Sequence, residues 1–331
     1  MGGGAPVTVQ SMCNTDTRDA QATLSQIRAM AEAGCDITRV AVPDREAALA
    51  LETIAAQSPL PVVADIHFDY RLALLAAEAG VAKIRINPGN IGGEDRVEAV
   101  AEACKARGIP IRIGVNSGSV SREKLERMNL TEAMVESALE QLGQLERFGF
   151  YDVCISIKAS DVPKTIECYR RLSALTDVPL HLGVTEAGTS YHGIIKSSIG
   201  IGALLCEGIG DTLRVSLTAD PVEEIRAGLA ILKACGLRRD GLELISCPTC
   251  GRCRIPVEAL ANEVDARLKG RKKPITVAVM GCAVNGPGEA RAADFGIAGG
   301  DGKGVVFKKG EIVAAVPTDE LLETLLGYIE E

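Results

Sequence analysis

From residue 7 to about residue 235, short runs of β-branched and aliphatic residues alternate with longer stretches whose apolar positions recur every three or four residues. The first pattern predicts buried parallel strands, and the second predicts helices that lay one face on those strands. Eight strands are expected, at residues 7–12, 37–42, 62–66, 83–87, 111–115, 152–157, 180–185 and 212–217. Helices are expected between them, at residues 19–33, 47–56, 71–79, 96–106, 131–148, 163–173 and 221–234.

Eight strands that alternate with helices over about 230 residues predict a closed (β/α)8 TIM barrel, whose usual size is about 250 residues. An open doubly wound sheet is the alternative. The chain has no G-x-G-x-x-G motif after its first strand, which disfavours that alternative.

After Gly236 the pattern changes to strands at 242–246, 275–280, 294–298, 304–307 and 312–316, with helices at 256–269 and 318–328. This order predicts a small α+β domain. We therefore expect a barrel domain at residues 1–237 and a second domain at 238–331, joined through the polar segment 237–241.

Composition narrows the function. The 331 residues carry a formal net charge of −8, which disfavours nucleic acid and membrane surfaces as partners because both attract basic faces. No apolar run reaches the roughly 18–20 residues of a membrane span. The first residues lack the pattern of a secretory signal, and the cysteines number eleven, which is odd. We therefore expect a protein of the reducing cytoplasm, without a disulfide framework.

Four cysteines of the second domain are candidate metal ligands, and three of them, Cys247, Cys250 and Cys253, lie within seven residues. Cys247 and Cys250 form a C-x2-C pair, and Cys282 lies in a glycine-rich loop directly after an apolar run. Thiolates at this spacing bind either zinc or an iron–sulfur cluster, and the pattern favours the cluster over zinc and over buried apolar cysteines. Cys253 and Glu289 are the candidates for a fourth ligand.

The ends of the predicted barrel strands are unusually charged. Barrel active sites lie at the carboxyl ends of the strands, and four arginines and a lysine are expected there. Such cations repel one another unless an anion lies among them, and arginine forks match phosphate oxygens two at a time. The alternative is that acidic neighbours pair with them, but Asp65 and Glu186 neutralise only two of the five. The polar residues at these strand ends are Arg39, Asp65, His67, Arg85, Asn87, Arg112, Asn116, Lys158, Thr185, Glu186, Arg214 and Ser216.

Eight motifs together resemble one enzyme family. They are residues 9–19 around VQSM, 64–68 (ADIHF), 85–92 (RINPGNIG), 158–161 (KASD), 182–188 (LGVTEAG), 208–217 (GIGDTLRVSL), 247–252 (CPTCGR) and 285–289 (NGPGE). The chain is similar along nearly its whole length to the 4-hydroxy-3-methylbut-2-enyl diphosphate synthases of the methylerythritol phosphate route to isoprenoids. It resembles their short, two-domain bacterial form.

The resemblance implies an iron–sulfur oxidoreductase with a [4Fe–4S] cluster held by Cys247, Cys250, Cys282 and Glu289. It implies reductive ring opening and dehydration of 2-C-methyl-D-erythritol 2,4-cyclodiphosphate to 4-hydroxy-3-methylbut-2-enyl diphosphate, with two electrons from ferredoxin or flavodoxin. It also implies a homodimer in which the cluster domain of one subunit closes over the barrel of the other.

By position, five residues resemble the family's diphosphate ligands: Arg39, Arg85, Arg112, Lys158 and Arg214. Asn87, Asn116, Thr185 and Ser216 resemble its polar pocket, together with the catalytic candidates Asp65, His67 and Glu186. Glu186 is the first choice for a proton donor, whereas His67 alone is almost as compatible with a structural role. Cys253 is either an accidental thiol or a competing ligand.

Two other functions remain open on the residues alone. One is a non-catalytic zinc or electron-transfer metalloprotein, and the other is a different phosphate-binding barrel enzyme, such as an aldolase, with a structural zinc domain. The visible absorbance of anaerobically purified protein separates a cluster from colourless zinc.

Overall fold

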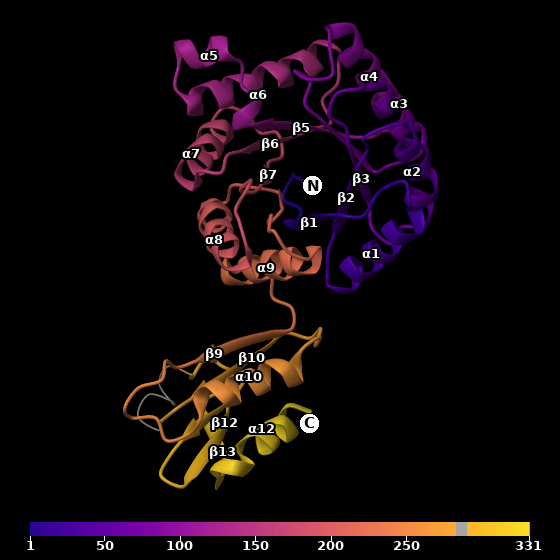
Figure 1. The fold of residues 1–331 in the computed structure, drawn as a ribbon. Coiled ribbons are helices and arrows are strands. Elements are labelled where there is room, and N and C mark those ends of the chain that lie inside the picture. The colour runs from indigo at the N-terminus through magenta and orange to yellow at the C-terminus, as the bar shows by residue number, and fades with distance from the viewer. Residues whose placement is uncertain (283–289, 331) are drawn as a thin grey trace. The chain divides into compact units, whose positions relative to one another are not determined.

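The computed structural model describes residues 1–282 and 290–330, and the chain divides into two compact units, Met1–Arg238 and Arg239–Glu331 (Figure 1). Each unit has a hydrophobic core of its own. Within the described residues, no helix combines the length and the apolar character needed to cross a bilayer.

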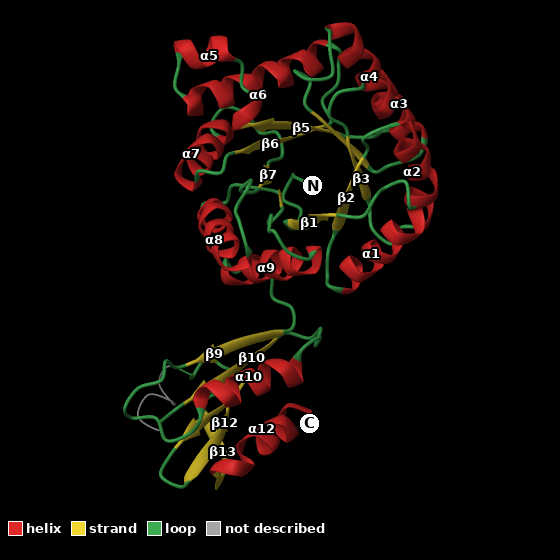
Figure 2. Ribbon diagram, in the orientation of Figure 1, coloured by secondary structure: helices red, strands yellow, loops and turns green. Residues whose placement is uncertain are grey.

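The first unit is a parallel barrel surrounded by helices (Figure 2). Its sheet runs in the order β6-β5-β4-β3-β2-β1-β8-β7, so the first strand pairs with both the second and the eighth. The predicted TIM barrel is confirmed, and the open sheet is excluded. The strands are β1 (Thr8–Met12), β2 (Ile37–Ala41), β3 (Val62–Asp65), β4 (Lys83–Ile86), β5 (Ile111–Asn116), β6 (Val153–Lys158), β7 (His181–Leu182) and β8 (Thr212–Leu213).

The helices that cover this barrel begin mostly at capping side chains, such as Asp19, Asp44 and Asp161, which accept hydrogen bonds from the first turn. They are α1 (Ala20–Glu32), α2 (Arg45–Gln57), α3 (Tyr70–Glu78), α4 (Glu94–Arg107), α5 (Arg122–Arg127), α6 (Leu130–Arg147), α7 (Val162–Ser173), α8 (Ser190–Cys206) and α9 (Pro221–Ala234).

The sequence prediction missed α8, because three glycines lower its helix propensity. Two of them serve packing. A Cβ at Gly193 would lie 2.5 Å from Leu217, and one at Gly200 would lie 2.7 Å from Val184. Tertiary packing therefore decides the conformation of this segment.

The barrel wall has an aliphatic outer face and a polar inner one. Val40, Ala64, Ile84 and Ile113 are fully buried under the helices. The alternate positions of the same strands carry the charged residues, because successive side chains of a strand point to opposite faces. The interior therefore departs from the usual filling of branched aliphatic residues.

Strands β6 and β7 meet at a weak seam. A single bridge joins Ile155 to Leu180. Next to it, the buried hydroxyl of Tyr169 on α7 accepts a hydrogen bond from the Ile157 amide (3.1 Å) and donates one to the His181 carbonyl (2.5 Å). The tyrosine thus takes the place of a strand-to-strand hydrogen bond and completes the wall.

The second unit is a five-stranded mixed sheet in the order β13-β12-β11-β10-β9. Its strands are β9 (Leu242–Ser246), β10 (Ile275–Met280), β11 (Phe295–Gly299), β12 (Lys303–Lys308) and β13 (Glu311–Pro317). Its helices include α10 (Val257–Leu268) and α12 (Leu321–Glu330). The predicted α+β character is confirmed. Lys309 and Gly310 both have positive φ, as the tight turn between β12 and β13 requires.

Candidate active site

Five cationic side chains lie on the barrel strands or directly after them, and we call them the cation cluster. Its members are Arg39 on β2, Arg85 on β4, Arg112 on β5, Lys158 at the end of β6 and Arg214 directly after β8. Arg39 lies in the middle of β2 and Arg112 is the second residue of β5, so these two do not lie at the carboxyl ends of their strands. Arg85 and Arg112 are adjacent in the ladder between β4 and β5. Burial lowers the pKa of Lys158 and of Arg39, and repulsion from the neighbouring arginines lowers both further.

Asp65 at the end of β3 is the central carboxylate of this cluster. It accepts a hydrogen bond from Arg85 (Nη1–Oδ1 3.1 Å), and Arg39 Nε lies 3.8 Å from its other oxygen. Burial disfavours the charge of Asp65, but Arg39, His67 and Arg85 outweigh burial and hold its pKa far below the usual range. Asp65 therefore stays ionised and binds these cations in place.

The second carboxylate is Glu224 on α9, which the sequence analysis did not name. Its side chain lies 3.3 Å from Arg214 (Oε1–Nη2) and also accepts hydrogen bonds from Ser11 Oγ (2.7 Å) and the Leu217 amide (2.9 Å). From the sequence this neutralising role was expected of Glu186, for which no ion pair is found among the described residues. The sequence contains a signal for Glu224, because its helical spacing places it on the buried face of α9 with Gly228 and Ile231.

Lys158 and Arg112 have no carboxylate partner among the described residues. Arg112 is 1% exposed and Lys158 is 8% exposed. Burial, followed by the neighbouring arginines, lowers the pKa of Lys158 well below its ordinary value, and burial lowers the pKa of Arg112 to about 10. Five cations thus share two carboxylates, which leaves a formal excess of three positive charges in a closed space.

Two glycines, Gly114 in β5 and Gly183 directly after β7, make room for these long side chains. A Cβ at Gly183 would lie 2.6 Å from Lys158 Nζ, and one at Gly114 would clash with the guanidinium of Arg85. Glycine inside a strand often marks such a close approach. The sequence analysis did not use this signal.

The other predicted site residues differ from one another in exposure and in hydrogen-bond partners. His67 is about half exposed and its Nε2 lies 3.3 Å from Asp65. Asn87 is buried, and its side-chain oxygen accepts hydrogen bonds from Gln141 (3.2 Å) and from the Gly89 amide (3.2 Å). Asn87 therefore shapes its own loop and is turned to α6.

Of four other predicted residues, Asn116 is the last residue of its strand, and Thr185, Glu186 and Ser216 lie in the loops beyond the strands. Asn116 ends β5 and its amide donates to Ser119 Oγ (3.0 Å). Thr185 and Ser216 are half-buried, and β7 and β8 end before them, at Leu182 and Leu213, so the two predicted strands are shorter than expected. Glu186 is exposed and has a φ of 52°, a left-handed backbone that is unusual outside glycine.

The cysteines of the second unit come from two loops at one edge of its sheet. Cys247 directly follows β9 and Cys282 follows β10, and these strands are parallel neighbours with Ser246 paired to Val279. The Gly281 amide donates a hydrogen bond to Cys247 Sγ (3.1 Å). Backbone N–H groups commonly donate hydrogen bonds to the sulfur ligands of iron–sulfur centres, so this contact fits a metal centre held by cysteines.

Cys253 belongs to the same place. Its sulfur accepts a hydrogen bond from the Cys250 amide (3.4 Å), and a Cβ at Gly281 would lie 2.5 Å from it. Glu289 lies outside the described residues. Within the described residues, no three ligand-type side chains converge as a ready metal site, so four-fold ligation stays a prediction.

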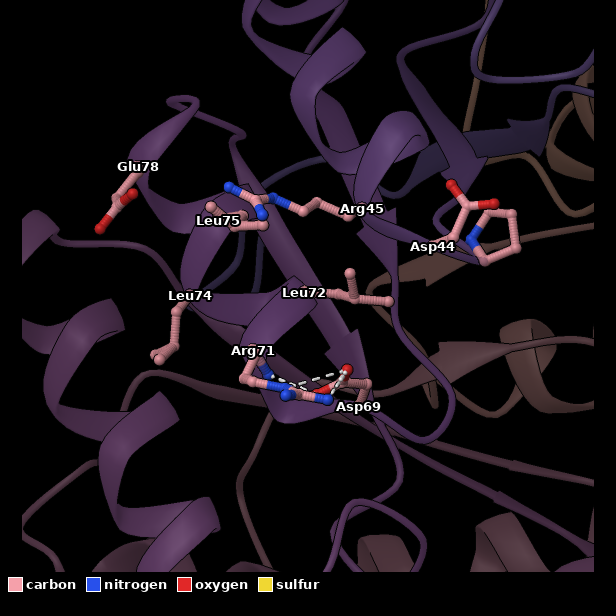
Figure 3. A pocket seen from close by; sticks show the side chains of 9 residues that line it. Asp44, Arg45, Asp69, Arg71, Leu72, Leu74, Leu75 and Glu78 are labelled. Carbon is pink, nitrogen blue, oxygen red and sulfur yellow. Dashed lines mark hydrogen bonds and ion pairs between the residues drawn. The ribbon is translucent and has the colours of Figure 1, made fainter.

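A separate cavity of about 650 Å³ lies between α2 and α3, and no member of the cation cluster lines it (Figure 3). Its arginine Arg71 is already paired with Asp69 at 2.8 Å. The lining contains three carboxylates and two arginines, so its net charge is negative and the cavity does not attract a polyanion. Its lining consists of Pro43, Asp44, Arg45, Asp69, Arg71, Leu72, Leu74, Leu75 and Glu78.

Solved structures with a similar fold are dihydropteroate synthases. The enzyme from Stenotrophomonas maltophilia has a TM-score of 0.53 and 18% identity, over 70% of this chain and 93% of its own. The Yersinia pestis enzyme has a TM-score of 0.52 and 12% identity, over 71% of this chain and 98% of its own. At such low identity this likeness shows the barrel fold alone.

Proteins found by sequence are far more similar to this chain than these solved structures are. The family profile described as the GcpE TIM-barrel domain matches residues 1–229, and that of the GcpE protein C-terminal domain matches residues 243–331. Curated proteins named 4-hydroxy-3-methylbut-2-en-1-yl diphosphate synthase (flavodoxin) cover 100% of this chain. The protein from Geobacter sulfurreducens is 58% identical over 94% of its length, and that from Clostridium perfringens is 58% identical over 95%. The relative from Desulfotalea psychrophila is 53% identical over 92% of its length. The chain therefore belongs to the GcpE family, whose curated members are 4-hydroxy-3-methylbut-2-en-1-yl diphosphate synthases.

Proposed function

We propose that this chain reduces 2-C-methyl-D-erythritol 2,4-cyclodiphosphate to 4-hydroxy-3-methylbut-2-en-1-yl diphosphate. The observation that carries the proposal is the cation cluster, in which five cations share Asp65 and Glu224. A diphosphate supplies the negative charge that this arrangement is missing. A purely structural ion-pair network would balance its charges.

The proposed cofactor is a [4Fe–4S] cluster on Cys247, Cys250, Cys282 and Glu289. When bound, such a cluster would pass electrons from the donor protein to the substrate and would provide a Lewis acid beside it. The relatives are named for flavodoxin, and we propose flavodoxin as the donor here. The free thiols fit a reducing cytoplasm, where we place the reaction.

The chain's own residues then have distinct tasks. The cation cluster holds the diphosphate and fixes the ring, so that positioning supplies part of the rate. As the ring opens, charge develops on the departing phosphate oxygen among the same side chains, which lowers the barrier. The side chains are already in place before the substrate binds, because Asp65 and Glu224 anchor three of them.

Glu186 is the proposed proton donor. Its left-handed backbone costs free energy in a residue other than glycine, and such strain concentrates at functional sites. His67 is the second candidate, because Asp65 orients its ring. The Glu186→Gln variant keeps the side chain's size and removes the proton. If product formation is unchanged in that variant, the assignment to Glu186 is wrong.

We also propose that each active site needs two copies of the chain. Helix α9 follows β8, and such a helix in a (β/α)8 barrel returns the chain to the amino ends of the strands, so we expect its last residue, Ala234, at the end opposite to the carboxyl ends. The few linker residues that follow extend at most about 3.6 Å each, so they are too short to reach the opposite end of the same barrel. Mixing Cys282→Ser chains with Arg214→Ala chains should restore part of the activity. If mixed dimers form without activity, the site is built within one chain.

The overall function is tested with protein purified and assayed without oxygen. Reduced flavodoxin and the cyclodiphosphate should give the linear diphosphate product, and the protein should be brown. Colourless protein that contains zinc would favour the alternative of a phosphate-binding barrel with a structural zinc domain.

A further inference from the structure

Strand β1 contacts two of the five cations directly and a third through Glu224, although it carries no charge itself. Gln10 Oε1 accepts a hydrogen bond from Arg112 Nη1 at 2.9 Å across the barrel. Met12 Sδ accepts from Arg39 Nε and Nη2 at 3.1 and 2.8 Å. On the other face of the strand, Ser11 holds the carboxylate that pairs with Arg214.

The acceptors on the inner face of β1 are neutral. Arg112 is the most deeply buried cation of the cluster, and no carboxylate among the described residues lies within ion-pair distance of it. A carboxylate in the place of the Gln10 amide would orient the guanidinium equally well. It would also cancel the charge of Arg112, because two opposite charges in contact form a pair of little net field.

The orientation of the Gln10 amide follows from its partner. A guanidinium donates hydrogen bonds and accepts none, so the atom of Gln10 that faces Arg112 is the carbonyl oxygen. Gln10 Nε2 and Arg112 Nε then remain buried without an acceptor among the described residues. Buried donors in native proteins find acceptors, so the pair presents unused donors to a ligand with acceptor oxygens.

We propose that Gln10 is a positioning residue for the anion site, which fixes the guanidinium of Arg112 while leaving its positive charge available to a diphosphate. Met12 does the same for Arg39. This role deepens the proposed function and rests on it. It also explains why a strand with the sequence Thr-Val-Gln-Ser-Met faces a cluster of cations without an acidic residue.

The experiment compares two Gln10 variants with a surface control in the full-length protein. Gln10→Glu keeps the shape and the acceptor but adds a negative charge, and Gln10→Met keeps the length but removes the acceptor. Gln57→Glu makes the same charge change at an exposed position at the end of α2. Isothermal titration with inorganic pyrophosphate reports anion affinity, and thermal unfolding reports stability.

We expect Gln10→Glu to weaken pyrophosphate binding at least about tenfold, the lower end of the range for one charge-assisted contact, without lowering the melting temperature. Gln10→Met should weaken binding about threefold and lower the melting temperature, because it leaves a buried guanidinium donor unpaired. Gln57→Glu should match the unaltered chain in both measurements. If Gln10 had only a structural role, the variant that loses more stability would also lose more affinity for pyrophosphate. We expect the opposite: Gln10→Glu should lose more affinity, and Gln10→Met should lose more stability.

Two results would overturn the inference, and they differ in what else they overturn. If the unaltered chain binds pyrophosphate and Gln10→Glu binds it equally well, the positioning role is wrong while the anion site stands. If the unaltered chain does not bind pyrophosphate, the anion site itself is wrong, and the role of Gln10 falls with it.

Discussion

Replacing Glu224 with glutamine should destabilise the barrel while leaving anion binding intact. The Glu224 carboxylate is buried, and it receives hydrogen bonds from Ser11 Oγ, the Leu217 amide and two nitrogens of Arg214. Glutamine keeps one oxygen for Ser11 or Leu217 but loses the charge that pairs with Arg214. The variant therefore leaves a mostly buried guanidinium without its counter-charge.

The size of the effect follows from these contacts. Breaking a buried ion pair from one side costs about 3–5 kcal/mol, and Arg214 is 17% exposed, so we expect a loss of about 3 kcal/mol. In a unit of this size that corresponds to a fall of about 6–12 °C in melting temperature. Glu223→Gln, one residue earlier on α9, is the matched control. Its partner Arg226 and Glu223 itself are both about half exposed, so the change should cost under about 0.5 kcal/mol.

The assay is denaturant unfolding followed by circular dichroism, with hydrogen exchange of β1 and α9 peptides to assign the loss to the barrel unit. Pyrophosphate should raise the melting temperature of Glu224→Gln at least as much as that of the unaltered chain, because the variant has one negative charge fewer beside the anion. If Glu224→Gln and Glu223→Gln unfold within about 0.5 kcal/mol of each other, the pairing with Arg214 contributes no stability and the reasoning is refuted.

Three further predictions concern the two sites. Cys282→Ser should lose iron and sulfide while Cys253→Ser keeps them, and the reverse result in metal analysis would move the ligand assignment to Cys253. Arg112→Ala should weaken cyclodiphosphate binding by about 1.5–3 kcal/mol without changing the visible spectrum, and an unchanged Kd would count against the anion site. Burial and the neighbouring arginines hold the pKa of Lys158 well below its ordinary value, and a bound anion should raise that pKa and draw in a proton. The affinity for the anion should therefore fall as the pH rises above the pKa that Lys158 has in the anion-free protein. Titrations in buffers of different ionisation heat should show more proton uptake by the unaltered chain than by Lys158→Arg, and equal uptake would contradict this.

The sequence predicted the barrel well because its strands and helices have clear periodicities. It failed at α8, where glycines that permit close packing hide the helix from propensity arguments. It also extended β7 and β8 too far, because Val184, Val215 and Leu217 continue the alternation of apolar residues past the last residues that the ladders reach, Leu182 and Leu213.

The cations of the site were visible from the sequence, because charged residues inside apolar runs are conspicuous. Their partners were not. Glu224 lies ten residues beyond Arg214 on a helix, and Gln10 lies 102 residues before Arg112. Pairings of this kind depend on which side chains the closed barrel directs inward, and a linear pattern does not give that information.

The seam between β6 and β7 has a consequence for how the barrel comes apart. Every other pair of neighbouring strands is joined by a ladder, whereas this pair is joined by one bridge, by the hydroxyl of Tyr169 and by a hydrogen bond from the Thr185 amide to the Ala159 carbonyl (3.3 Å) directly beyond the strands. The first opening of the wall should therefore occur there, and it should leave an intact curved sheet with β6 and β7 as its two free edges. A chain divided in the loop before β7 would be cut beside the pair of strands that no ladder joins. The two fragments would then have to reassemble through β1 and β8, the pair that joins the beginning of the barrel to its end.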